Sequence, residues 1–443
     1  MLRYFRMLRE RLQLTWGNKD MRVTLLFGLE GLMLQYVTSI NGFGNNLYAT
    51  NMGASDSQIG MVQLVLNLVA VVLLLPIGIV ANRQRSSKTL PVAMLLFMGA
   101  MYFVYATVPE FGSNRIAFFF VFLGLTAGVL AVYNAQWQAF FGDAVEERKR
   151  NGVYSFRNRF MFLVGTVAPV VCGLCMGTAV DSEGKLVVLR VFYYIAGALV
   201  LCQALILSRI PCPKRTDEEM AAIKRFSPRE IGQALGQMAT TRAFRSFFLC
   251  IMFFYLAWHL DWSMWYIGQT QYIHMTEAQL SYYNGLVCVG QLLTVGLFAR
   301  LNERKTVHFS FIFAVLGHTF CSLAMLVGVN LPQGSQLIPF MAMGILGSVP
   351  QGCIQLCAVQ MLLDVTPQRN RALIISLHTM VVTLSNAVMP YLGVQLYQAL
   401  GADHHAMTLF ALIALCARGS AALLFIWRYR HLKKTGRLHP TMP

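Results

Sequence analysis

Asp143-Ala-Val-Glu-Glu-Arg-Lys-Arg150 recurs in the second half of the chain as Asp364-Val-Thr-Pro-Gln-Arg-Asn-Arg371. Both stretches read D-x-x-x-x-R-x-R, and the second begins 221 residues after the first, since 364 − 143 = 221. The same offset pairs Gln58 with Gln279 and Pro169 with Pro390. Several matches at one offset indicate that the chain contains a duplicated unit.

Long apolar stretches fill each copy of this unit. The 443 residues are 56% hydrophobic and 12% charged, with a mean hydropathy of +0.54, which exceeds what a soluble core of this length normally holds. About 20 apolar residues in a helix cross a bilayer core of about 30 Å. We predict twelve such helices, at 22–48, 58–81, 89–108, 115–141, 153–177, 188–208, 244–270, 278–300, 307–328, 337–362, 372–397 and 406–427. The predicted fold is an all-α polytopic membrane protein with two pseudo-symmetric six-helix bundles.

The basic residues gather on one side of these helices. The net charge is +17, with 36 Lys and Arg. Arg115, Lys185 and Arg190 fall on the opposite side and Arg418 falls within the last helix, so the other 32 are assigned to one side. The positive-inside rule makes that side cytoplasmic, together with both termini. The charge therefore reflects membrane orientation, and no nucleic-acid partner is expected.

The predicted domains follow from these segments. Residues 1–21 are expected to form a cytoplasmic basic surface helix, and the two bundles to occupy 22–208 and 244–428. The linker 209–243 contains the helix-start patterns Thr216 with Glu219 and Ser227-Pro228, which predict short surface helices. Residues 429–443 form a basic cytoplasmic tail. The ten cysteines lie mainly in apolar segments, so no disulfide is expected.

Two loops carry a family resemblance. Gly78-Ile-Val-Ala-Asn82-Arg83 follows the second predicted helix, and Gly296-Leu-Phe-Ala-Arg300 follows the eighth. With the basic residues after them, both resemble the signature loop of the major facilitator superfamily. The signature aspartate is replaced by Asn82 in the first loop and by Arg300 in the second.

The resemblance implies the twelve-helix fold of that family and a cytoplasmic latch between its halves. The matching positions are Gly78, Asn82, Arg83, Asp143, Arg148, Arg150, Gly296, Arg304, Asp364, Arg369 and Arg371. Gly165 to Gly173 around Pro169 also resembles a glycine and proline motif of exporters in the family, which favours export. A symmetric helix kink, repeated at Pro390, is the alternative interpretation. Proton-coupled drug exporters of the family often carry an arginine in the fourth helix. This chain has Gly124 and Gly128 in that region, which disfavours a drug–proton antiporter.

Two carboxylates are predicted inside the membrane, where charged groups are costly and mark functional sites. Glu30 lies in the first helix and Asp261 in the seventh, and the family lines its cavity with helices 1, 4, 7 and 10. Both are candidates for proton coupling. A continuous seventh helix would place one aromatic face around Asp261, suited to an organic cation. Its members are Phe254, Trp258, Asp261, Trp262, Trp265 and Gln269. An interfacial aromatic belt is the alternative.

Polar side chains on three cavity helices are further candidates for substrate binding. They are Gln35, Asn41, Asn134, Gln138 and Gln355. Together with Trp258, Asp261 and Trp262 of the seventh helix, they make up the predicted substrate-binding set. Hydrogen bonding between helices is the alternative for each amide. His378 is a candidate proton relay, with a packed histidine as its alternative. His318 and Arg418 are interpreted as structural.

The sequence predicts a secondary active transporter of a small or amphiphilic organic solute, in the cell membrane, working by alternating access and with protons as the candidate coupling ion. The alternative is an uncoupled lipid flippase or facilitator, or a substrate-sensing receptor. No metallopeptidase, nucleophile-elbow or phosphate-loop motif occurs, so no enzyme activity, metal or cofactor is expected. The chain is expected to act as a monomer in the bilayer.

Overall fold

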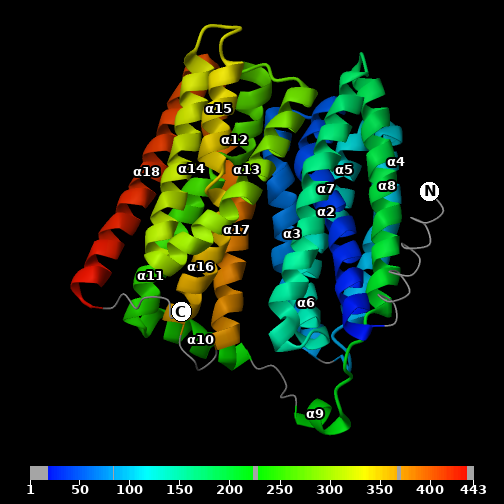
Figure 1. Cartoon of the computed structure of the whole chain (residues 1–443). Coiled ribbons are helices and arrows are strands. Elements are labelled where there is room, and N and C mark those ends of the chain that lie inside the picture. The colour runs from blue at the N-terminus through cyan, green and yellow to red at the C-terminus, as the bar shows by residue number, and fades with distance from the viewer. Residues whose placement is uncertain (1–17, 83, 223–227, 367–370, 437–443) are drawn as a thin grey trace, which may run out of the picture. The chain divides into compact units, whose positions relative to one another are not determined.

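The computed structural model describes residues 18–82, 84–222, 228–366 and 371–436. In that part of the chain, every regular element is a helix (Figure 1). Most of the predicted N-terminal surface helix lies outside the described residues, as do the predicted latch residues Arg83 and Arg369.

The first half contains six membrane-length segments. The bounds are α2 (Lys19–Asn51), α3 (Asp56–Asn82), α4 (Thr89–Thr107), a 3₁₀ turn η1 (Val108–Asn114), α5 (Arg115–Leu123), a π turn η2 (Gly124–Gly128), α6 (Val129–Ala144), α7 (Glu147–Gly177) and α8 (Ser182–Arg209). The chain turns within η1, where Gly112 has a φ of +58° that favours glycine. The fourth crossing runs from α5 through η2 to α6.

Two short helices precede the second half, which also has six segments. The bounds are α9 (Asp217–Ala222), α10 (Pro228–Thr240), α11 (Arg242–His259), α12 (Trp262–Ile267), η3 (Gly268–Tyr272), α13 (Glu277–Arg304), α14 (Val307–Asn330), α15 (Leu337–Ser348), α16 (Gln351–Val365), α17 (Arg371–Ala399) and α18 (His404–Lys434). The seventh crossing is α11, α12 and η3, and the tenth is α15 with α16.

The predicted twelve-helix fold is confirmed. In the described residues, ten helical stretches are long and apolar enough to span a bilayer. One of them, Thr89–Ala144, has 56 residues and contains two crossings separated by η1. The remaining crossing is α13. Each predicted span lies on one of these segments.

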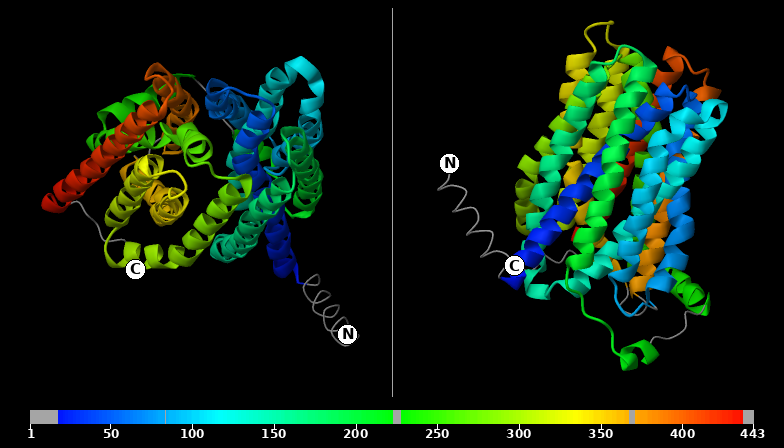
Figure 2. Two further views of the ribbon diagram at one scale, coloured as in Figure 1. Left: turned by 90° about the horizontal axis from the view of Figure 1, so that it is seen from above. Right: turned by 90° about the vertical axis from the view of Figure 1, so that its right-hand side faces the viewer.

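Contacts divide the chain into two compact units. Unit 1 contains 1–48, 72–172 and 181–224, and unit 2 contains 49–71, 173–180 and 225–443. Figure 2 shows the ribbon from two further directions. The predicted domain boundaries at 208 and 244 stay a prediction.

The seventh crossing is not the continuous helix predicted for 244–270. α11 ends at His259 and α12 begins at Trp262, with Asp261 in a non-helical conformation between them. α17 packs closely against this interruption at Gly393, where a Cβ atom would lie 2.0 Å from the Leu260 carbonyl oxygen. Glycine is required here because any side chain would collide with backbone, which cannot move aside as a flexible side chain can.

Gly393→Ala is therefore expected to destabilise the protein by about 1–3 kcal/mol, the usual cost of overpacking. The measurement is the thermal unfolding midpoint of the purified protein in detergent. Gly419→Ala in α18 is the matched control, because its Cβ would lie 3.9 Å from the nearest neighbouring atom, Thr319 Cγ2 of α14. The control should match or exceed the wild type, since alanine favours helix. Equal midpoints for the two variants would contradict the close approach.

Candidate functional site

Each unit contains one buried carboxylate, and each carboxylate pairs with a buried arginine. Glu30 and Asp261 are the buried acidic side chains of the described residues, at 0% and 5% exposure. Glu30 pairs with Arg157 in unit 1, and Asp261 pairs with Arg418 in unit 2. Neither carboxylate is an isolated charge.

The Glu30 carboxylate joins four helices of unit 1. Its Oε2 accepts a hydrogen bond from Arg157 Nε of α7 at 2.8 Å. Its Oε1 accepts from the Tyr133 hydroxyl of α6 at 3.0 Å and from Gln203 Nε2 of α8 at 2.9 Å. Both oxygens of this α2 side chain are therefore occupied by protein donors.

Local sequence makes room for the arginine. A Cβ atom at Gly31 would lie 2.5 Å from Arg157 Cγ. The glycine next to Glu30 therefore leaves room for the Arg157 side chain to lie against α2. The guanidinium carbon of Arg157 lies 4.0 Å from the centre of the Trp137 ring, a cation–π arrangement. These contacts fix the pair in one geometry inside unit 1.

The Asp261 carboxylate lies at the interruption of the seventh crossing. An aspartate before a helix usually caps it, but the Asp261 side chain makes no such bond and contacts Arg418 Nη2 instead. Arg418 also donates to backbone carbonyls, through Nη1 to His318 at 2.9 Å and through Nη2 to Trp258 at 3.3 Å. The arginine thus connects α18 to α14 and to the end of α11.

Histidine and aromatic rings surround this pair. Trp258 and His318 meet edge to face with ring centres 4.5 Å apart. His318 Nδ1 lies 3.0 Å from Gln351 Nε2, and His259 Nδ1 lies 2.8 Å from the Ser385 hydroxyl. Within the described residues, His318 Nε2 and Arg418 Nε have no hydrogen-bond partner. Around Glu30, Gln203 Oε1 and Trp137 Nε1 likewise have no partner among the described residues, so the two sites differ in the helix interruption at Asp261 and not in the presence of unpartnered polar atoms.

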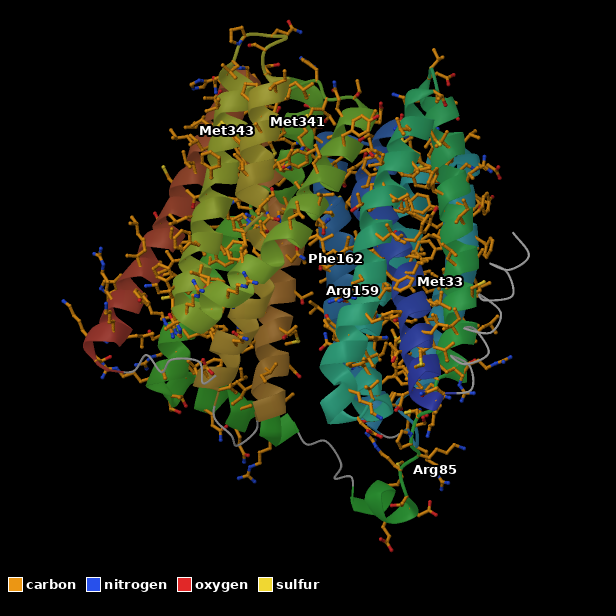
Figure 3. The ribbon with its side chains drawn as sticks, in the orientation of Figure 1. Met33, Arg85, Arg159, Phe162, Met341 and Met343 are labelled. Atoms are coloured by element: carbon orange, nitrogen blue, oxygen red, sulfur yellow. The ribbon has the colours of Figure 1, made fainter. Side chains whose placement is uncertain are left out.

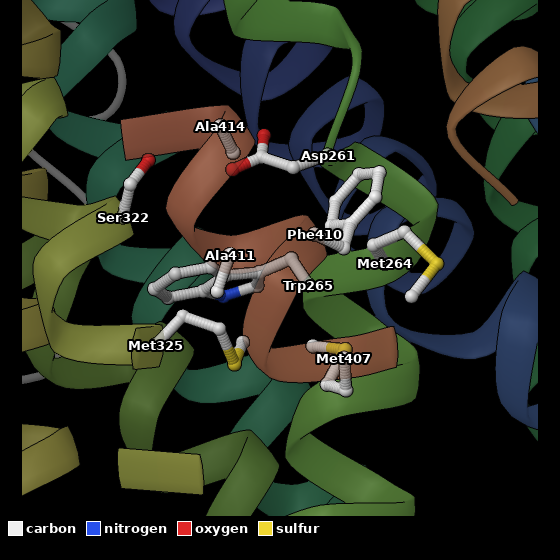
Figure 4. A pocket seen from close by; sticks show the side chains of 9 residues that line it. All are labelled: Asp261, Met264, Trp265, Ser322, Met325, Met407, Phe410, Ala411 and Ala414. Carbon is white, nitrogen blue, oxygen red and sulfur yellow. The ribbon is translucent and has the colours of Figure 1, made fainter. Parts of the chain in front are cut away.

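A small cavity adjoins the Asp261 carboxylate (Figure 4). Its volume of about 10 Å³ is close to the room that one water molecule needs. The residues that line it are Asp261, Met264, Trp265, Ser322, Met325, Met407, Phe410, Ala411 and Ala414. The cavity therefore places one carboxylate and one hydroxyl in an otherwise apolar wall.

The predicted aromatic face is interrupted, because the chain leaves the helix at Asp261, although the Trp258 and Trp262 rings still meet edge to face with centres 6.0 Å apart. Trp258 is 8% exposed and packs in the core, whereas Trp262 is 36% exposed. Trp265 lies against the rings of Tyr283 and Phe340, at 6.3 and 5.2 Å between centres. With Arg418 already beside it, the Asp261 carboxylate is not a free partner for an organic cation.

The predicted amide residues belong to both units, and their convergence at one site stays a prediction. Gln35 Nε2 donates to Ser39 at 3.1 Å, and Asn41 Nδ2 donates to the Tyr102 hydroxyl at 2.6 Å. Asn134 and Gln138 are exposed on α6. The side chain of Gln355 is outside the described atoms. Gln35 and Asn41 make the polar contacts between and within helices that were the alternative interpretation.

His378 lies between aromatic rings in unit 2. Its ring centre is 6.1 Å from that of Phe247 and 6.0 Å from that of Phe248, and the residue is 6% exposed. Within the described residues its Nε2 has no hydrogen-bond partner. This is the surrounding of a packed histidine, and its proton-relay role stays a prediction.

The described part of the first signature loop contacts the start of the linker within unit 1. Arg85 pairs with Asp217 at 2.6 Å, and Lys88 Nζ donates to the carbonyls of Ser208 and Ile210, both at 3.0 Å. Figure 3 labels Arg85 at this end of unit 1.

The other predicted latch residues show no contacts that would define a latch in the described structure. Asp143, Arg304 and Asp364 are exposed, and a Cβ atom at Gly78 would meet no neighbour within 4 Å. The side chains of Asn82, Arg148, Arg150 and Arg371, and the surroundings of Gly296, are outside the described atoms. The latch stays a prediction.

Sequence reasoning missed both arginine partners. Arg157 was counted among the cytoplasmic loop charges although it falls inside the predicted span 153–177, and the structure buries it. Arg418 was interpreted as structural because the twelfth helix is peripheral in the family. A charge inside a span needs an opposite charge. Searching the predicted spans for arginines, which include Arg157, Arg159 and Arg418, could have identified candidate partners for both carboxylates.

Comparison with known protein families identifies the family to which this twelve-helix architecture belongs. The family model described as Major Facilitator Superfamily matches residues 29–317 and, in a second match, 247–441. No curated protein sequence matches the chain.

Solved structures share the fold at low identity. A D-xylose–proton symporter is 13% identical, with a TM-score of 0.68 over 92% of this chain and 97% of that one. The nucleoside transporter NupG is 12% identical, with a TM-score of 0.65 over 92% and 99%. A bacterial homologue of the human lysosomal transporter Spinster is 14% identical, with a TM-score of 0.64 over 96% and 98%. On the family match and the twelve-helix fold, the chain belongs to the major facilitator superfamily.

Proposed function

We propose that this protein is a proton-coupled secondary transporter of a small organic solute, working by alternating access, with the Asp261–Arg418 pair as its coupling element. The observation that carries this proposal is the interruption of a membrane-spanning helix at a buried ion pair. Transporter sites near the middle of the membrane are commonly built on such discontinuous helices. Of the two buried carboxylates in the described residues, Asp261 has this setting and Glu30 does not.

The two pairs differ in how freely they can exchange a proton. Both Glu30 oxygens already accept hydrogen bonds from protein groups on three other helices. The Asp261 carboxylate instead borders a cavity with room for a water molecule, and Ser322 lines the same cavity. A water molecule in that cavity would lie beside Asp261 and would supply a partner for proton exchange, whereas Glu30 is enclosed by protein donors.

Protonation of Asp261 would remove the negative charge that holds Arg418. The arginine would keep its carbonyl acceptors on α11 and α14 but would lose its counter-charge, so the packing of α18 against the interruption would change. The titratable groups that face the pair are His259 on α11, His318 and Cys321 on α14, and Tyr283 on α13. A packing change at a helix interruption supplies the physical step between two transport states.

The remaining parts of the proposal follow from the sequence. The distribution of basic residues supports cytoplasmic termini in a cell membrane. The glycine and proline stretch around Pro169, which lies inside α7, supports export. The competing proposal is an uncoupled facilitator or lipid flippase on the same scaffold, or a substrate-sensing receptor, in which the Asp261–Arg418 pair would serve structure only.

Asp261→Asn is expected to abolish the response of transport to a proton gradient, because the amide cannot take up and release a proton. The measurement is flux of a ligand, found by thermal-shift screening, into proteoliposomes with and without a pH gradient. Wild-type flux should change several-fold with the gradient, and flux of the variant should not. Asp261→Glu, which keeps the titratable group, should retain part of the response. A gradient response in Asp261→Asn equal to that of the wild type would overturn the coupling role.

Glu30→Gln is the comparison in unit 1, since it makes the same chemical change at a fully bonded carboxylate. It is expected to cost about 3–5 kcal/mol of stability, because Arg157 would be left as an unpaired buried charge. The flux of the folded fraction should still respond to the pH gradient.

Adding Arg157→Met should recover most of the thermal unfolding midpoint, since an apolar side chain tolerates the site. Loss of the gradient response in folded Glu30→Gln protein would show that the coupling proton is held in unit 1 instead.

A further inference from the structure

The Ser322 hydroxyl on α14 is buried and has no hydrogen-bond partner among the described residues. It lies close to the Asp261 carboxylate but outside hydrogen-bonding geometry. Serine and threonine inside a helix commonly donate to the carbonyl oxygen four residues earlier. Thr319, one turn earlier on α14, does so at 3.0 Å. The corresponding carbonyl for Ser322 is that of His318, which already accepts from Arg418, so the Ser322 hydroxyl is left to the cavity that it lines.

The cavity has the size and the polarity of a site for one water molecule. Its volume of about 10 Å³ is close to the room that one water molecule needs. A buried water also needs at least two polar partners. The Asp261 carboxylate supplies an acceptor, and the Ser322 hydroxyl can both donate and accept. Methionine, aromatic and alanine side chains form the rest of the wall (Figure 4). A metal cation is disfavoured, because Arg418 already balances the charge of Asp261.

We propose that one water molecule occupies this cavity and bridges the Ser322 hydroxyl to the Asp261 carboxylate, with Ser322 as the residue that positions it. A bridging water is nearly as favourable as a direct hydrogen bond, and it satisfies a hydroxyl that the helix leaves without an acceptor. The water site is independent of transport. Its role in proton exchange with Asp261 rests on the proposed function, for which Ser322 becomes a positioning residue.

Three methionines in the wall make this water detectable. Met264, Met325 and Met407 line the cavity and are 1%, 4% and 1% exposed. X-ray irradiation of water produces hydroxyl radicals, which oxidise a neighbouring thioether to the sulfoxide in aerated solution. Radicals from the bulk solvent reach buried side chains poorly, so oxidation of a buried methionine reports water held beside it. Met361 is the internal control, because it is 0% exposed and does not line the cavity.

The experiment irradiates the full-length protein in detergent and measures the sulfoxide at each methionine by mass spectrometry. In the wild type, the three cavity methionines should be oxidised several-fold faster than Met361. Ser322→Ala should bring their rates close to that of Met361, because the water would keep only one polar partner. Rates equal to that of Met361 in the wild type, or unchanged rates in Ser322→Ala, would overturn the proposal.

Ser310→Ala is the matched control variant. Ser310 is also on α14, is 0% exposed and has no hydroxyl partner in the described part of the chain, but it does not line the cavity. Its methionine oxidation should match that of the wild type. An equal loss of cavity labelling in Ser310→Ala and Ser322→Ala would overturn the assignment of the water to Ser322.

A second measurement tests the role of Ser322 in proton exchange. Infrared difference spectra recorded on acidification should show a protonated carboxyl band that is missing in Asp261→Asn. The stretching frequency of a carboxyl C=O group rises when a hydrogen bond is lost. The band should therefore move to higher frequency in Ser322→Ala and keep its position in Ser310→Ala. An unshifted band in Ser322→Ala would contradict the positioning role.

The water site and the coupling role can fail separately. If no carboxyl band belongs to Asp261 between about pH 5 and pH 8, the coupling proposal fails, and methionine oxidation still decides the water site. If the Asp261 band is present while the cavity methionines are oxidised no faster than Met361, only this inference fails.

Discussion

A charge inside the hydrocarbon core needs an opposite charge, because neither lipid nor packed side chains can replace the water it has lost. Much of the interior of this protein can be understood from that constraint. Glu30 and Asp261 are each matched by an arginine from a different helix of the same unit. Each pair joins helices that are distant in sequence, and an unmatched carboxylate or arginine at either position would be strongly destabilising.

The two pairs use the same interaction for different purposes. Glu30 lies in a continuous helix, accepts three hydrogen bonds and is supported by the Trp137 ring behind Arg157. Asp261 lies where a helix is interrupted, beside a small cavity. A carboxylate that bonds donors of three other helices suits a scaffold. A pair at a helix interruption beside a cavity can be rearranged with less loss of regular helix, which suits an element that changes between transport states.

Most of the fold was predictable from sequence because membrane thickness fixes helix length, and duplication fixes the arrangement in halves. The candidate site was less predictable from sequence than the fold. Periodicity assumes a regular helix, so it could not show that the chain leaves the helix at Asp261 against Gly393. Nor does sequence spacing reveal which distant helix supplies a counter-charge, and Arg157 and Arg418 were therefore not recognised as partners. Both carboxylates, in contrast, stood out as charges inside apolar spans.

The central claim is that Asp261 exchanges a proton when the transporter binds its solute. Proton release or uptake on ligand binding, measured with a pH indicator in weakly buffered solution, tests it most directly. The account predicts that the wild type and Glu30→Gln exchange about one proton per ligand bound at saturation, and that Asp261→Asn exchanges none. An unchanged proton exchange in Asp261→Asn, or none in the wild type at any pH between about 5 and 8, would contradict the account.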